Sequence, residues 1–245
     1  MNDRRYALTA GVLFIIATAA DLLGAAVRPD LTGTDYLTQV AAQGDRVAAG
    51  ALLLLIAAFA CAGIAISMYP ILRKANAGLA LGSVVFRTME AVMYVIAVVS
   101  LLSLLTLGQE QLVSAGAAER ASLGAVGGLL LSLREHAALA GVFAFCLGAF
   151  LYYCALFQSR LIPRWLSGWG IAAIILLAMA GVLALFNHDA VTGYVPLASQ
   201  IFLQEMVLAL WLIAKGFTPS VVRADDLSAT RQAIPALEDH APVAA

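Results

Sequence analysis

Six long apolar stretches constrain this chain more than any other feature of its sequence. A helix needs about 20 predominantly apolar residues to cross the hydrocarbon core of a bilayer. Stretches of this kind occupy residues 6–27, 47–69, 79–107, 136–157, 169–186 and 197–217. Because lipid offers no hydrogen bonds to the backbone, such stretches are predicted to be α-helices. The expected fold class is therefore all-α, a polytopic integral membrane bundle of about six transmembrane helices.

The composition agrees with burial in lipid. The 245 residues are 62% hydrophobic and only 12% charged, whereas roughly a quarter of a soluble domain is charged. The net charge is −1 and basic residues never cluster beyond adjacent pairs, so no nucleic-acid partner is expected. Membrane lipids are the expected partners, and the predicted location is a cell membrane, as a multi-pass protein of a bacterial plasma membrane. The sequence does not define an oligomeric state.

The loop charges predict an orientation, because cytoplasmic loops carry an excess of Lys and Arg. With the N-terminus in the cytoplasm, the outer side keeps only Arg28, Arg46, Arg120 and Arg134. The inner side then collects Arg4, Arg5, Arg73, Lys74, Arg160, Arg164, Lys215, Arg223 and Arg231. Both termini are therefore predicted to be cytoplasmic.

Two segments leave alternatives open. Residues 117–133 permit a helix that either lies at the interface or extends the fourth span outward, and their glycines make them too weak for a seventh span. The first stretch could instead be a cleaved signal peptide, although its length of about 22 residues exceeds the usual apolar region of such peptides. Residues 1–217 are expected to form the transmembrane domain. Residues 218–245, polar and with three prolines, are expected to form a disordered cytoplasmic tail.

Ionisable residues inside the predicted spans are the informative exceptions, since each costs about 2.5–3.5 kcal/mol at the bilayer centre. They are Asp21, Arg87, Glu90 and Glu205. Ser83, Arg87, Glu90 and Tyr94 are spaced by four, three and four residues, which places them on one face of a helix. Counting 1.5 Å per residue from the helix ends, Arg87, Glu90 and Glu205 lie near mid-membrane. Arg87 is predicted to pair with Glu90 or Glu205.

These groups predict an intramembrane polar cavity. Its candidate lining residues are Arg87, Glu90, Glu205, Gln204, Gln200, Tyr94, Ser83, Asp21 and His136. Asp21 and His136 lie nearer the outer side, so the cavity is expected to open outward. One arginine among three carboxyl groups leaves an excess of acid, which a proton, a cation or water would compensate. The alternative interpretation is that the charges only hold helices together through hydrogen bonds.

No catalytic residue, cofactor or metal site is predicted. The cysteines lie within apolar runs without a C-x-x-C spacing, and His136 has no second intramembrane histidine with which to hold a haem. The leading hypothesis is a non-enzymatic protein that binds or transports a small-molecule ligand. A structural or regulatory membrane scaffold is the second hypothesis. An intramembrane lipid-modifying enzyme ranks last, because no paired nucleophile and base are present.

Aromatic residues cluster where the fourth and fifth spans meet the inner interface. The predicted aromatic belt consists of Tyr152, Tyr153, Trp165 and Trp169. Arg160 and Arg164 fall between these aromatic residues. Their alternation predicts contact with the headgroups of anionic lipids.

Three segments carry a recognisable pattern: KANAGLALGSVVFRTMEAVMYVIAVVSLLSLL at 74–105, SRLIPRWLSGWG at 159–170 and EMVLALWLIAKGF at 205–217. With them the chain resembles the bacterial family catalogued as domain of unknown function 4386, over roughly residues 6–217. Members of that family are multi-pass membrane proteins without an assigned activity, so the resemblance implies a topology and no mechanism. It also implies that Arg87 and Glu90, within the stretch G-L-A-L-G-x-x-x-F-R-x-x-E-A, are part of a sequence pattern that members of the family have in common.

Overall fold

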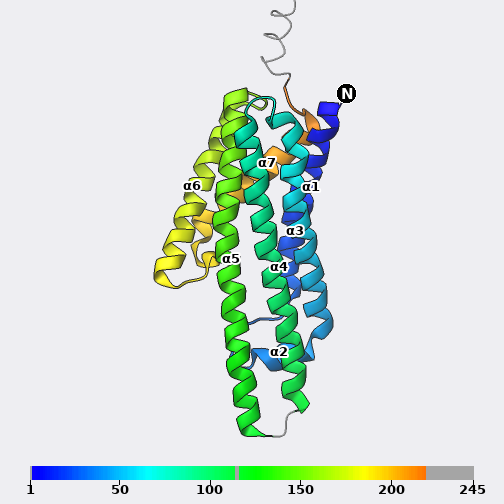
Figure 1. Cartoon of the computed structure of the whole chain (residues 1–245), viewed down its shortest axis with the longest axis vertical. Coiled ribbons are helices and arrows are strands. Elements are labelled where there is room, and N and C mark those ends of the chain that lie inside the picture. The colour runs from blue at the N-terminus through cyan, green and yellow to red at the C-terminus, as the bar shows by residue number, and fades with distance from the viewer. Residues whose placement is uncertain (1, 114–115, 219–245) are drawn as a thin grey trace, which may run out of the picture.

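The computed structural model describes residues 2–113 and 116–218, and these residues form helices without any strand (Figure 1). The elements are α1 (Asn2–Val27), α2 (Tyr36–Ala42), α3 (Gly44–Leu72), α4 (Ala77–Val113), α5 (Ala117–Ser159), α6 (Arg164–Asn187), the 3₁₀ helix η1 (Val191–Tyr194) and α7 (Val195–Ala214). The tail predicted at 219–245 lies outside the described residues.

The six predicted spans are confirmed as helices. In the described part of the chain, α1, α3, α4, α5, α6 and α7 are each long and apolar enough to cross a membrane. Their ends differ from the predicted bounds: α4 and α5 continue past the apolar runs at 79–107 and 136–157, whereas α7 ends at Ala214, before the predicted end at 217. The short elements α2 and η1 fall in the connections between predicted spans.

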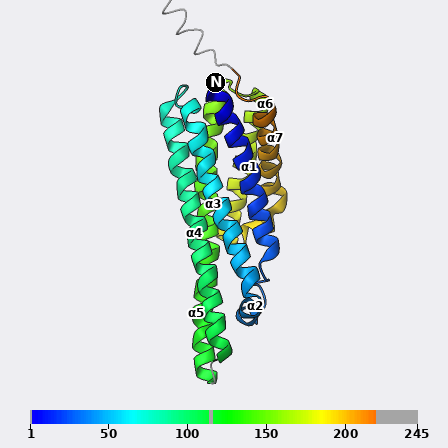
Figure 2. The same ribbon diagram turned by 90° about the vertical axis from the view of Figure 1, so that its right-hand side faces the viewer.

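The α4–α5 hairpin settles the open question about residues 117–133. Helix α5 continues without a break from Ala117 to Ser159, so this segment extends the fourth span rather than forming a separate helix at the interface. The 43 residues of α5 and the 37 of α4 correspond to about 64 Å and 55 Å of helix. A hydrocarbon core is about 30 Å thick. Accordingly, the two helices project together beyond the rest of the bundle (Figures 1 and 2).

The helices pack as a continuous bundle (Figure 2). Helix α4 lies between α3 and α5, α6 lies against α5 and α7, and α1 lies against both α3 and α7. Large apolar side chains such as Phe59, Leu52 and Leu210 remain more than 60% exposed on the outside. Such a surface suits acyl chains and not water.

Both described ends of the chain lie at the same end of the bundle (Figure 1). The guanidinium group of Arg4 donates to the carbonyl oxygens of Leu212 at 3.1 Å and Ile213 at 2.5 Å, which ties α1 to the end of α7. The α3–α4 and α5–α6 turns lie at this end too (Figure 1). The fold thus gathers at one end the described basic residues that the sequence analysis assigned to the inner side. Which end faces the cytoplasm stays a prediction.

Candidate functional site

One face of α4 is polar and buried, as its spacing predicts. Ser83, Arg87 and Glu90 are 1%, 1% and 4% exposed, and Tyr94 is partly buried on the same face. The Ser83 hydroxyl donates to the carbonyl oxygen of Ala80 at 2.8 Å. Ser83 is therefore satisfied within its own helix, which leaves Arg87 and Glu90 as the charged groups of this face.

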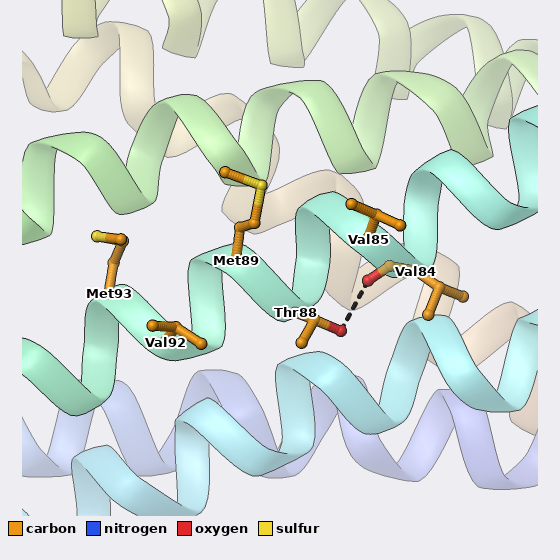
Figure 3. A pocket seen from close by; sticks show the side chains of 6 residues that line it. All are labelled: Val84, Val85, Thr88, Met89, Val92 and Met93. Carbon is orange, nitrogen blue, oxygen red and sulfur yellow. Dashed lines mark hydrogen bonds between the residues drawn. The ribbon is translucent and has the colours of Figure 1, made fainter.

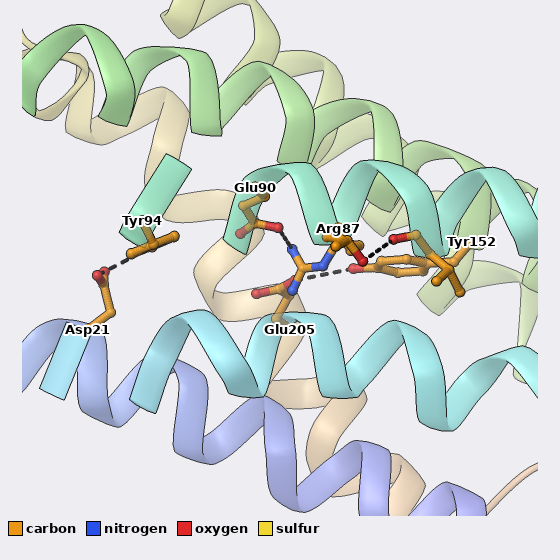
Figure 4. A network of polar contacts seen from close by, with 8 residues as sticks. Asp21, Arg87, Glu90, Tyr94, Tyr152 and Glu205 are labelled. Atoms are coloured by element: carbon orange, nitrogen blue, oxygen red, sulfur yellow. Dashed lines mark hydrogen bonds and ion pairs between the residues drawn. The ribbon is translucent and has the colours of Figure 1, made fainter. Parts of the chain in front are cut away.

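Arg87 and Glu90 form an ion pair in the interior of the bundle (Figure 4). Arg87 Nη1 lies 2.8 Å from Glu90 Oε2, and the guanidinium carbon lies 4.7 Å from the centroid of the Phe145 ring on α5. Gly148 allows this approach, because a Cβ there would come within 2.9 Å of Arg87 Cγ. The predicted pairing with Glu90 is present, and α5 supplies a ring and a glycine that accommodate the arginine.

The pair is incompletely hydrogen-bonded. Arg87 Nε has no hydrogen-bond partner among the described residues, and the 2.8 Å contact of Nη1 with Glu90 Oε2 lacks the alignment of a hydrogen bond. We treat this contact as an ion pair, since the two groups are oppositely charged and close. Buried charges are normally both paired and hydrogen-bonded. Arg87 therefore retains donor capacity that the described protein groups do not use.

Glu205, on α7, lies beside the ion pair of Arg87 and Glu90 (Figure 4). Its Oε1 accepts a hydrogen bond of 3.2 Å from the Tyr152 hydroxyl on α5. The carboxyl group also lies on the side of the bundle that Arg87 faces (Figure 4). In the described part of the chain, however, the ion pair of Arg87 is with Glu90. We define Arg87, Glu90, Glu205 and Tyr152 as the central polar cluster.

A second set of contacts joins α5, α6 and α7. The Tyr153 hydroxyl donates to Gln204 Oε1, and Gln204 Nε2 donates to the carbonyl oxygen of Leu166 at 3.1 Å. Gln204 is fully buried. Gly170 of α6 leaves the space that the Tyr153 ring occupies, because a Cβ at Gly170 would overlap that ring.

The assignment of Tyr152 and Tyr153 to an aromatic belt is wrong. Both side chains are 0% exposed, because the last turns of α5 pack against α6 and α7 and each hydroxyl finds an acceptor there. A signal was available in the sequence. Phe145, Gly148 and Tyr152 are three and four residues apart and so share one helix face, the face that meets Arg87 and Glu205.

Asp21 and Tyr94 form a separate contact. The Tyr94 hydroxyl donates to Asp21 Oδ1 at 3.3 Å, which links α4 to α1 (Figure 4). Tyr94 follows Glu90 by one helical turn, so this contact lies about 6 Å further along α4 than the ion pair. Each of the three predicted carboxyl groups thus has a polar partner in the bundle.

Two candidate residues do not join these contacts. Gln200 is partly buried and its side chain makes no hydrogen bond within the described residues. His136 is exposed on α5, about 18 Å along the helix from Gly148 at 1.5 Å per residue. The structure therefore does not bring His136 to the central polar cluster.

A groove of about 390 Å³ lies on the outer face of α4 (Figure 3). Its lining residues are Val84, Val85, Thr88, Met89, Val92 and Met93. The Thr88 hydroxyl donates back to the carbonyl oxygen of Val84 at 2.8 Å, so it is satisfied within the helix. This groove is almost entirely apolar, and none of the residues of the central polar cluster lines it.

Six apolar helices that enclose an ion pair between them define a multi-pass α-helical membrane protein. Within that class, the family described as Domain of unknown function (DUF4386) matches residues 9–216, and the chain belongs to this family. No curated protein and no solved structure matches the chain.

Proposed function

We propose that this protein binds a small polar ligand carrying a positive charge at the central polar cluster, and moves it through the bundle. The observation that carries the proposal is the make-up of the buried cluster, in which one guanidinium group meets two carboxyl groups and Arg87 Nε lacks a hydrogen-bond partner among the described residues. A second carboxyl group, Glu205, faces the pair without forming an ion pair with Arg87. Intramembrane ionisable groups commonly mark ion and substrate pathways.

The charge of the cluster favours a cation. Within the cluster, Arg87 supplies one positive charge, whereas Glu90 and Glu205 supply two carboxyl groups; the third carboxyl group, Asp21, lies outside the cluster at its contact with Tyr94. Carboxylates without a counter-charge are costly in a medium of low dielectric constant. A bound cation or amine would balance the acid, while the unused N–H of Arg87 would donate to a polar oxygen of the ligand or to a water molecule. The membrane is proposed to be a bacterial plasma membrane, with the cavity opening outward.

A second candidate function rests on a different observation. Tyr94–Asp21, Tyr152–Glu205 and Tyr153–Gln204 each join two different helices. Hydrogen bonds of this kind contribute about 0.6 kcal/mol each inside membrane bundles. A structural or regulatory scaffold would need no more than these contacts.

Ligand-induced stabilisation separates the two functions. The purified full chain is heated in detergent with sodium, potassium, ammonium, primary amines or amino acids, and unfolding is followed through tryptophan fluorescence. A ligand present at 100 times its dissociation constant adds about 2.7 kcal/mol, a rise of about 5–11 °C for a protein of this size. The rise should disappear in Glu205→Gln.

The matched control is Ser100→Ala, since Ser100 is a buried polar residue of α4 whose hydroxyl donates to its own helix at Ile96. This variant should keep the full rise. A rise of equal size in Glu205→Gln would place binding outside the cluster. Absence of any rise, together with an electron-microscopy map without density between Arg87 and Glu205, would leave the scaffold function.

A further inference from the structure

The α5–α6 turn forms a pocket at the end of the bundle that carries the N-terminus. Its volume is about 400 Å³, and its lining residues are Arg160, Ile162, Pro163, Arg164 and Thr218. Ile162 is 1% exposed, so the core anchors the floor of the pocket. Thr218 is held in place because its backbone N–H donates to the carbonyl oxygen of Leu161 at 2.8 Å. The pocket is thus built from two distant parts of the chain.

The two arginines of this pocket, Arg160 and Arg164, have no ion-pair partner among residues 2–113 and 116–218. The guanidinium carbon of Arg164 lies 5.2 Å from the centroid of the Phe157 ring, which orients it. Arg160 adopts the left-handed conformation, with φ of 53°, which favours glycine. An arginine therefore ends α5 where a glycine would be the ordinary residue.

The start of α6 adds hydrogen-bond donors to the same place. Pro163 precedes the helix and provides no side-chain cap. Among the described residues, the backbone N–H groups of Arg164 and Trp165 have no acceptor. The first turn of a helix favours anions, because its free N–H groups and its dipole are both positive. The lining of the pocket, as far as the structure describes it, therefore combines two cations with the start of a helix and includes no carboxylate.

The position of the pocket relative to the membrane indicates which kind of anion binds there. Helix α5 ends at Ser159 and α6 begins at Arg164, and both helices are able to span a membrane. The turn between them therefore lies where the chain leaves the hydrocarbon. Trp165, 57% exposed beside the pocket, is a residue typical of that interface. Guanidinium groups bind phosphate through paired, charge-assisted hydrogen bonds.

We propose that this pocket binds the phosphate of an anionic phospholipid headgroup, with the acyl chains lying beside Trp165. A zwitterionic headgroup would bring its own cation to the two arginines, so an anionic headgroup is preferred. The site is independent of the central polar cluster, which involves other residues. Its occupancy does not depend on the proposed ligand function.

The test is a titration of the full chain in mixed micelles of a neutral detergent and one phospholipid. Phosphatidylglycerol should raise the unfolding temperature at a lower mole fraction than phosphatidylcholine. Each basic residue near an anionic surface contributes about 1 kcal/mol, which is about fivefold in affinity. Arg160→Gln and Arg164→Gln should therefore each weaken the phosphatidylglycerol affinity about fivefold. The double lysine variant keeps both charges but loses the paired guanidinium hydrogen bonds, so its affinity should lie between that of the unmodified chain and that of the double glutamine variant.

The matched control is Arg73→Gln at the α3–α4 turn. Arg73 is exposed at the same end of the bundle and lies over the Tyr69 ring at 5.8 Å, but it lines no part of the pocket. An equal loss of affinity in Arg73→Gln would reduce the effect to general surface charge and overturn the proposal. Equal stabilisation of the unmodified chain by both lipids would also overturn it. If inorganic phosphate alone at millimolar concentration gives the same stabilisation, the pocket is a free-phosphate site and not a lipid site.

Discussion

Arg87→Met should destabilise the bundle strongly, and a second substitution should restore part of the loss. The single variant leaves Glu90, 4% exposed, without the cation that lies 2.8 Å away. Breaking a buried pair in this way costs about 3–5 kcal/mol. For a chain of this length, the loss corresponds to a fall of about 6–20 °C in the unfolding temperature.

The second substitution identifies the partner. In Arg87→Met with Glu90→Gln, the carboxylate that was ion-paired with Arg87 is also removed and only Glu205 keeps its charge, so the unfolding temperature should recover by more than half of the loss. Arg87→Met with Glu205→Gln should recover less, because Glu205 is not ion-paired with Arg87. Glu90→Gln alone should cost less than Arg87→Met, since Arg87 then still faces Glu205 (Figure 4).

The assay is thermal unfolding of the purified variants in one detergent, followed through the three tryptophans of the chain. Arg73→Met is the control, an exposed arginine over a tyrosine ring, and should change stability by no more than about 0.5 kcal/mol. Strict additivity of Arg87→Met and Glu90→Gln would refute the reasoning, because coupled groups must show an interaction energy. A stable double variant that loses the phenotype of the gene would favour the ligand function over the scaffold.

Three further outcomes are expected. Gly170→Ala should destabilise the protein by about 1–3 kcal/mol, because the added carbon displaces the buried Tyr153 ring. Gly124→Ala should stabilise it by up to about 1 kcal/mol, because no other helix or side chain lies within 4 Å of the added carbon. Unfolding temperatures check both variants, and equal effects would contradict the packing argument. Tyr94→Phe should cost about 1–3 kcal/mol, because it removes the donor to a partly buried carboxyl group of α1; an unchanged unfolding temperature would argue against this contact. In a cysteine-free background in intact cells, an impermeant thiol reagent should label a cysteine at Thr34 but not one at Ala75, two exposed positions at opposite ends of the bundle; the reverse pattern would invert the predicted orientation.

Local patterns in the sequence were enough to predict the spans and the ion pair. Span length follows from the rise of 1.5 Å per residue and the thickness of the hydrocarbon. Arg87 and Glu90 are three residues apart on one helix, so their pairing requires no knowledge of how helices pack.

Contacts between helices were harder to predict. Tyr152 and Tyr153 have the composition and position of an interfacial belt, and only the rotation of α5 against α6 and α7 turns both rings inward. The glycines of 117–133 made this segment too weak to count as a seventh span, yet Gly127 lies against Tyr36 and Leu37 of α2, where a Cβ would clash. These outcomes depend on the packing of separate elements, which single-helix periodicity does not encode.

The α4–α5 hairpin also offers a practical route to the structure of the membrane-embedded cluster. The whole chain has a mass of only 25.6 kDa, little of which would stand clear of a micelle to guide particle alignment in electron microscopy. Between Val113 and Ala117 the two longest helices approach their ends side by side, well beyond the rest of the bundle (Figures 1 and 2). A rigid helical protein could be fused so that its own helices continue α4 and α5 without a break. Its orientation relative to the bundle would then be fixed. It would act as an alignment mark fixed to α4, the helix that carries Arg87 and Glu90.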